Sequence, residues 1–262
     1  MDSTGLDIQD QGNGQNWLKK FPKYHSQTVS FLKKHPESLP VLEALYDSEI
    51  NFVDASLGAL FRTLELEKNS LIIITSDHGE EFLEHGQMGH TNNLYQESIR
   101  IPLIVKFPHS SKKEIVEEQC NLVDIMPTVL SFLDLKPAAQ ILGKTFWGKR
   151  ISLFGIKKGL IKKGRRHYNF SELDKFFIQK TLLTPKWKYI YNYRNKKEQL
   201  YHMKSDPLEL NNLANKKIKQ CYKLKEQLFG WVSNAKKTPT RKQLYQLSTE
   251  EEEKLKSMGY VK

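Results

Sequence analysis

Hydrophobic residues recur with helical spacing between residues 42 and 66. The apolar stripe consists of Leu42, Leu45, Ile50, Val53, Leu57, Leu60, Phe61 and Leu64. A repeat every three to four residues, with acidic residues between, predicts an amphipathic helix. The polar pair Lys68 and Asn69 follows and is expected to break this helix.

Two short apolar runs come next, LIIIT at residues 71–75 and IPLIV at residues 101–105. Each is continuous and rich in branched side chains, which is typical of strands buried on both faces of a parallel sheet. Residues 121–135 (NLVDIMPTVLSFLDL) again show helical periodicity. The order of helix, strand, loop, strand and helix predicts an α/β fold built in layers.

The character of the chain changes after residue 152. Residues 153–166 hold six lysines and arginines with three glycines and are interpreted as a solvated basic linker. Four short segments rich in aromatic residues then predict a small antiparallel sheet, at residues 167–173, 176–183, 188–193 and 199–203. A helix over residues 212–231 would pack on that sheet. The expected domains are therefore a lead-in at 1–40, an α/β part at 41–152, the linker, and a C-terminal subdomain at 167–262.

Composition narrows the class of protein. Hydrophobic residues make up 39% of the 262 residues, enough for a folded core, and no apolar run approaches the roughly 18 residues of a membrane helix. The 41 basic against 30 acidic residues give a formal charge of +11, which favours acidic partners. Cys120 and Cys221 match no metal or redox spacing, so two free thiols are expected.

The segment SDHGEEFLEHGQMGHT at residues 76–91 carries the chemistry. Asp77 and His78 directly follow the first apolar strand, and strand ends are where α/β sheets bind ligands. A carboxylate beside an imidazole suits a metal ion, although one Asp-His pair in a loop is more often solvated polar sequence. His85 and His90 follow closely, so the cluster indicates a polar pocket able to hold an anion.

These strings together resemble the sulfatases of the alkaline phosphatase superfamily. LIIITSDHGEEFLEHGQMGHTNNLYQESIRIPLIV resembles the family's metal-binding strand and following loop, and LYDSEINFVDASLGALFRTLE resembles the preceding helix. VDIMPTVLSFLDL, KWKYIYNY, QLYHMKSDPLELNNLA and EEEKLKSMGYV follow in the family's order, from residue 43 to the end of the chain. The resemblance implies part of the family's layered α/β sheet with a small C-terminal antiparallel sheet and helix.

The resemblance also implies roles for individual residues. Asp77 and His78 match the family's third and fourth metal ligands; the family favours calcium, whereas a histidine ligand admits manganese or zinc. His90 falls where many sulfatases have a lysine that touches the sulfate, so it is expected to bind substrate and act as general acid. His85 is expected to face the substrate or to support the site. The implied substrate is a sulfated or phosphorylated small molecule or glycan, and no specific nucleic acid is expected.

The family's nucleophile string, Cys or Ser followed by x-Pro-x-Arg, is absent from the 262 residues, and neither Cys120 nor Cys221 fits it. The chain is therefore expected to be inactive alone and to need a missing N-terminal half as partner. Two alternatives stay open: a phosphomonoester or phosphodiester hydrolase of the same superfamily, and a non-catalytic module that binds anionic polymers through residues 157–166. The N-terminal residues show no secretory pattern, and localisation is left open.

Overall fold

The computed structural model describes residues 25–90, 93–111, 113–117, 119–135, 168–174 and 178–237, together with residues 249 and 253. The chain divides into two compact units, Met1–Lys225 and Glu226–Lys262. The described part of the second unit is mainly the end of helix α7 (Ile218–Lys237). All other strands and helices described below lie in the first unit.

The expected long helix is confirmed. The N-terminal helices are α2 (His25–Lys34), η1 (Pro36–Ser38), α3 (Leu39–Thr63) and α4 (Leu66–Asn69). The break comes earlier than Lys68, because Glu65 takes a left-handed backbone conformation (φ 50°) between α3 and α4. None of the α3 residues is buried, and Ile50 and Val53 of its apolar stripe are each 53% exposed.

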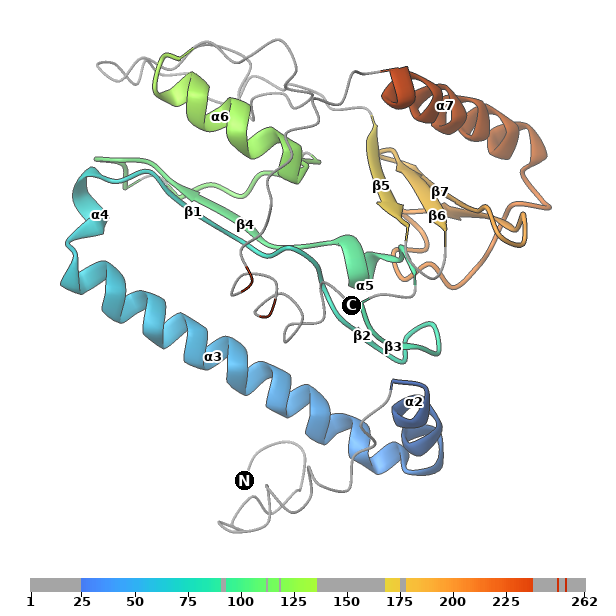
Figure 1. Cartoon of the computed structure of the whole chain (residues 1–262), viewed down its shortest axis with the longest axis horizontal. Helices are drawn as coiled ribbons and strands as arrows, with labels where there is room; N and C mark the ends of the chain where they lie inside the picture. Colours follow the sequence, from blue (N-terminus) through green and yellow to red (C-terminus); the bar gives the residue numbers. More distant parts are fainter. Residues whose placement is uncertain are drawn as a thin grey trace. The chain divides into compact units, whose positions relative to one another are not determined.

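The two apolar runs form strands β1 (Ile72–Thr75) and β4 (Leu103–Lys106), which pair with each other (Figure 1). The expectation of parallel strands buried on both faces is wrong. The pair is antiparallel, and Ile104 is 57% exposed. A parallel pair needs a crossover that returns the chain to the starting end of the sheet. Here β4 instead begins at the end of the sheet where β1 ends, and it runs in the opposite direction. Thr75, the last residue of β1, therefore pairs with Leu103, the first residue of β4.

Short elements fill the segment between β1 and β4. They are the hairpin strands β2 (Glu81–Phe82) and β3 (Met88–Gly89) and the single-turn helix α5 (Gln96–Ile99). After β4, η2 (Leu122–Asp124) and α6 (Ile125–Phe132) confirm the helix expected at 121–135, in shorter form. Phe132 is 8% exposed and lies with its ring 6.0 Å from that of Phe107.

The C-terminal antiparallel sheet is confirmed. It runs in the order β5 (Asn169–Leu173), β6 (Gln179–Leu183), β7 (Trp187–Asn192) and β8 (Glu198–His202). Leu182, Tyr189 and Leu200 are fully buried in it. Helix α7 begins at Ile218 rather than near residue 212. The Asn212 side chain accepts hydrogen bonds from the backbone N–H groups of Leu200 and Ala214, which holds this segment in a turn.

Several expectations fall outside the described residues. The basic linker at 153–166 is one of them, so the domain boundaries stay a prediction. Both cysteines are free, as expected. Across the described ranges, none of the helices is long and apolar enough to span a bilayer.

Candidate functional site

Asp77 and His78 lie immediately beyond the end of β1. The His78 backbone N–H donates to Asp77 Oδ1 at 3.0 Å, and His78 Nε2 lies 3.6 Å from Asp77 Oδ2. His78 Nδ1 lies 2.9 Å from the Gly79 carbonyl oxygen, which can only accept, so Nδ1 carries the proton. Donation from Nδ1 to a backbone carbonyl is how proteins orient a histidine ligand, and in the neutral ring it leaves the Nε2 lone pair on the side of the Asp77 carboxylate. The two residues therefore fit a divalent cation.

The backbone next to this pair passes very close to the segment that follows β3. The Gly79 N–H donates to the Ser98 carbonyl oxygen at 2.9 Å. A Cβ atom on Gly79 would lie 2.0 Å from the Glu97 carbonyl oxygen, far inside van der Waals contact. Glycine at this position thus allows the segment around Ser98 to support the end of β1.

His90 lies against His78. The two imidazole rings are stacked with centroids 3.6 Å apart, and His90 Nδ1 donates to Glu80 Oε2 at 2.9 Å. One side-chain atom from each of His78, Glu80 and His90 falls within 4.8 Å of the others. The His90 side chain is 40% exposed, so it is accessible to solvent and solutes. The structure therefore brings three of the residues singled out from the sequence together, and it adds Glu80.

His85 occupies a different place. Its Nδ1 is hydrogen-bonded to Glu97, its Nε2 lies 3.1 Å from the Glu209 carbonyl oxygen, and its ring stacks on Tyr95 at 3.6 Å. Both ring nitrogens face oxygen acceptors, an arrangement that the imidazolium form satisfies because it donates from both nitrogens. Burial alone lowers the pKa of His85, but the hydrogen bonds and charges of Glu97 and Glu209 outweigh burial and raise it. His85 thus joins the loop after β2 to the turn that carries Glu209.

Glu81 holds the same loop from inside. Its side chain is fully buried and accepts the backbone N–H groups of His85 at 3.0 Å and Gln87 at 2.8 Å. It also accepts a hydrogen bond from the buried amide of Asn93. In all three hydrogen bonds an N–H group donates to the Glu81 carboxylate, so this side chain stabilises the conformation of the loop.

A buried ion pair connects the C-terminal sheet to this region. Lys188 Nζ of β7 lies 2.6 Å from Glu209 Oε1, and both side chains are fully buried. Glu209 Oε2 also accepts the backbone N–H of Gln96 at 2.6 Å. Burial lowers the pKa of Lys188 to about 8, although Glu209 opposes the shift, and burial raises the pKa of Glu209.

Sequence reasoning did not identify Glu80, Glu81, Glu97, Lys188 or Glu209. Acidic residues in a polar loop and a lysine in a strand usually face solvent. Glu209 lies in the turn after Asp206 and Pro207 and has a positive φ of 56°. Glu209 does lie in the turn SDPLEL, within the string that resembles the family's C-terminal subdomain, but nothing in that resemblance marks the glutamate.

The pH dependence of stability tests the arrangement of His85. Because its folded pKa is raised, its hydrogen bonds stabilise the fold fully below the unfolded histidine pKa of about 6.5, and this contribution is lost as pH rises through the folded pKa. We expect His85→Gln to cost roughly 1–3 kcal/mol at low pH and clearly less at high pH. Urea unfolding of both proteins at pH 6 and pH 9 measures this. His35→Gln, beside Glu37 at an exposed pair, is the control, and an equal cost of His85→Gln at both pH values would contradict the imidazolium.

Family models match most of the chain. The model described as Sulfatase matches residues 12–135. The model described as N-sulphoglucosamine sulphohydrolase, C-terminal, matches residues 84–237, which is more than half of the chain. The two matches overlap in the segment that carries His85, His90 and Glu97.

Individual proteins show the same similarity. Arylsulfatase K of Canis lupus familiaris is 30% identical over 217 residues, which cover 80% of this chain and 40% of that protein. The phosphonate monoester hydrolase of Agrobacterium radiobacter has a similar structure, with a TM-score of 0.62 and 23% identity over 81% of this chain and 43% of that one. So does a protein solved with its substrate D-glucosamine-2-N,6-O-disulfate, with a TM-score of 0.57 and 23% identity over 74% and 41% of the two chains. The structural similarity supports the alkaline-phosphatase-like fold. The chain spans less than half the length of these proteins.

Proposed function

Because the chain belongs to the sulfatase family, we propose that it supplies one side of a metal-dependent site that hydrolyses sulfuric esters. The observation that carries this proposal is the pairing of Asp77 with the oriented Nε2 of His78, with His90 stacked alongside. The family's nucleophile string is absent from the 262 residues. The proposal therefore assigns to this chain the metal ligands and the group beside the leaving oxygen.

Asp77 and His78 are the proposed metal ligands. A bound divalent ion would polarise the sulfuryl oxygens and stabilise negative charge that develops on them. The Gly79 carbonyl oxygen fixes the orientation of the His78 ring from behind. The family favours calcium, but an imidazole nitrogen is a better ligand for manganese or zinc. We expect the nitrogen ligand to give manganese or zinc the tighter binding.

His90 is the proposed acid. Its Nδ1–H donates to Glu80, which fixes the orientation of the ring. When the ring carries a second proton on Nε2, this N–H can hydrogen-bond a sulfuryl oxygen or give its proton to the departing alkoxide oxygen. His85 has both ring nitrogens engaged, so we propose that it holds residues 83–97 in place, while its expected contact with substrate stays a prediction.

A sulfated saccharide is the proposed substrate class. The structurally similar protein named above was solved with a disulfated glucosamine as its substrate, which supports this choice. A phosphoester hydrolase of the same superfamily is the second candidate, since the phosphonate monoester hydrolase shares the fold. The same side chains would suit a sulfuryl or a phosphoryl group, since both are tetrahedral oxyanions; these side chains are Asp77, His78 and His90.

Manganese binding tests the proposed ligands. We expect Mn²⁺ to broaden the NMR signals of the His78 and His90 rings selectively, because a paramagnetic ion acts on nuclei near it even at partial occupancy. Asp77→Asn and His78→Gln should remove the effect. Asp47, which is exposed, and His202, which is half-buried as His78 is, provide the matched controls Asp47→Asn and His202→Gln.

The same titration separates two positions for the ion. If Glu80→Gln abolishes the broadening and Asp77→Asn does not, the cation lies within the His78, Glu80 and His90 set and the proposed ligand pair is wrong. Broadening spread over surface carboxylates, unchanged in every variant, would contradict a metal site at the end of β1.

A further inference from the structure

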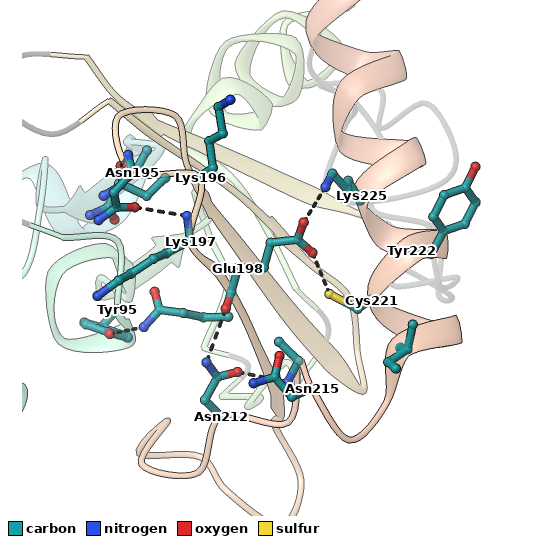
Figure 2. A pocket seen from close by; sticks show the side chains of 15 residues that line it. Tyr95, Asn195, Lys196, Lys197, Glu198, Asn212, Asn215, Cys221, Tyr222 and Lys225 are labelled. Atoms are coloured by element: carbon teal, nitrogen blue, oxygen red, sulfur yellow. Dashed lines mark hydrogen bonds and ion pairs between the residues drawn. The ribbon is translucent and has the colours of Figure 1, made fainter.

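A second concave site lies on the C-terminal subdomain, away from the Asp77–His78 pair. A cavity of about 940 Å³ opens between the turn that joins β7 to β8, the loop at residues 212–215, and the start of α7 (Figure 2). Its lining is mostly polar, with six carboxamide side chains and three lysines among fifteen residues. We call this space the turn cavity.

The carboxamides of the turn are oriented by the backbone. Asn192 Oδ1 accepts the N–H groups of Arg194 at 2.9 Å and Asn195 at 3.3 Å. Asn195 Oδ1 accepts the N–H of Lys197 at 3.0 Å. Because the oxygens are used in this way, Asn192 and Asn195 offer their NH₂ groups, which only donate. Together with the exposed ammonium groups of Lys196 and Lys197, they make this wall of the turn cavity a set of hydrogen-bond donors.

The carboxylate among the lining residues, that of Glu198, already has two partners within the protein. Figure 2 shows Lys225 and Cys221 of α7 both directed at Glu198, and both bond to its carboxylate, Cys221 Sγ at 3.0 Å. Burial alone raises the pKa of Glu198, but these two hydrogen bonds and the Lys225 charge outweigh burial and lower it. Burial raises the pKa of Cys221 to about 12, so the thiol keeps its proton and goes on donating. The charges left unpaired at the turn are therefore positive.

From this donor wall we infer that the turn cavity binds the anionic groups of a sulfated saccharide. An oxyanion is the acceptor that NH₂ and ammonium donors complement, and charge-assisted bonds of this kind are the strong ones. The volume is much larger than one sulfate ion needs and lies in the range of sites for drug-sized ligands. The choice of sulfate over other oxyanions rests on the proposed function.

The aromatic residues of the cavity argue against a nucleic acid. Single-stranded nucleic acid sites stack bases on free aromatic faces. Here the Tyr95 ring is already stacked on His85, so among the lining residues Tyr222 alone offers an exposed aromatic ring, whereas a single-stranded site stacks successive bases. Tyr95 also connects the turn cavity to the loop of the first site, because Gln199 of β8 donates to its hydroxyl at 2.5 Å.

Calorimetry on the full chain tests this inference, with a heparin-derived hexasaccharide as the probe at constant salt. Asn192→Asp keeps the oxygen that accepts the turn N–H groups and replaces the donating NH₂ with a charged acceptor. We expect it to weaken binding by about tenfold or more. The double variant Lys196→Gln with Lys197→Gln should weaken binding similarly. Because both positions are exposed, this variant still tests the inference if Asn192→Asp disturbs the fold of the turn. Lys33→Gln with Lys34→Gln, at two exposed positions that end α2, makes the same charge change elsewhere and should leave affinity within about twofold.

The possible outcomes distinguish binding at the turn cavity from binding elsewhere on the chain and from binding of other ligands. The titrations are done in metal-free buffer, which keeps the proposed metal-dependent site out of the measurement, so binding at the turn cavity should persist even if that site fails its own metal test. Equal weakening in the α2 variant would mean diffuse attraction by net charge and would overturn the inference. So would undiminished binding of the desulfated hexasaccharide, equal affinity for inorganic sulfate alone, or tighter binding of a thymidine oligonucleotide that depends on Asn192.

Discussion

Lys188→Met is expected to lower the free energy of unfolding by about 3–5 kcal/mol. The substitution leaves the Glu209 carboxylate fully buried without its partner ammonium, 2.6 Å away in the native protein. A buried unpaired charge costs much more than the pair contributes, because neither water nor a counter-charge reaches it. The cost should shrink as pH falls and Glu209, whose pKa burial raises, takes up a proton. Urea unfolding as a function of pH measures both effects.

Two further variants separate the buried charge from lost packing. Lys188→Met combined with Glu209→Gln removes both charges and keeps an oxygen for the Gln96 N–H, so it should be more stable than Lys188→Met alone. Lys180→Met, in the neighbouring strand β6, breaks a partly exposed pair with Glu172 and should cost no more than about 1 kcal/mol. If Lys180→Met and Lys188→Met lower the free energy of unfolding by similar amounts, burial of the Lys188–Glu209 pair does not raise the cost of breaking it, and the prediction is wrong.

Gly79→Ala is expected to destabilise the first unit by about 3 kcal/mol or more. The added methyl group would lie 2.0 Å from the Glu97 carbonyl oxygen, and the opposing group is backbone, which cannot rotate away as a side chain does. Relief requires moving β1's end from the Ser98 segment and breaking the Gly79 N–H bond. Thermal unfolding measures the loss, and ring NMR signals of His78 should shift with it.

Gly230→Ala is the matched control for this clash. Gly230 lies inside α7, and beyond its chain neighbours and the helix's own nearby backbone no atom lies within 4 Å of the position that a Cβ would take. Alanine there should stabilise the helix by up to about 1 kcal/mol. If Gly79→Ala is as harmless as Gly230→Ala, the close approach between residues 79 and 97 does not exist in solution.

Periodicity and composition predicted most of the elements. The long helix α3, strands β1 and β4, helix α6 and all four strands of the C-terminal sheet follow from local patterns of apolar and polar residues. The antiparallel pairing of β1 with β4 could not be predicted in this way, because short apolar runs such as LIIIT and IPLIV occur in both parallel and antiparallel pairs. The start of α7 was also missed, since it depends on the Asn212 side chain bonding to Leu200 of a distant strand.

The candidate site was predictable in part. Asp77, His78 and His90 stand out in one segment, and the structure places them together. The supporting residues come from elsewhere: Glu209 lies more than a hundred residues after His85, and Lys188 is in a separate sheet. Their charges are buried only because the C-terminal turn folds against the loop, which no local pattern in either segment reveals.

Sulfate binding at His90 is the most direct measurement of the proposed chemistry. The chain is titrated with inorganic sulfate, with and without the diamagnetic ion Zn²⁺, while the ring signals of its histidines are followed by NMR. We predict that sulfate shifts the His90 signals only when the metal is present, and that Asp77→Asn abolishes the shift. A His90 ring that ignores sulfate in the metal-loaded chain, or that responds equally without metal, would contradict a sulfatase site built on Asp77, His78 and His90.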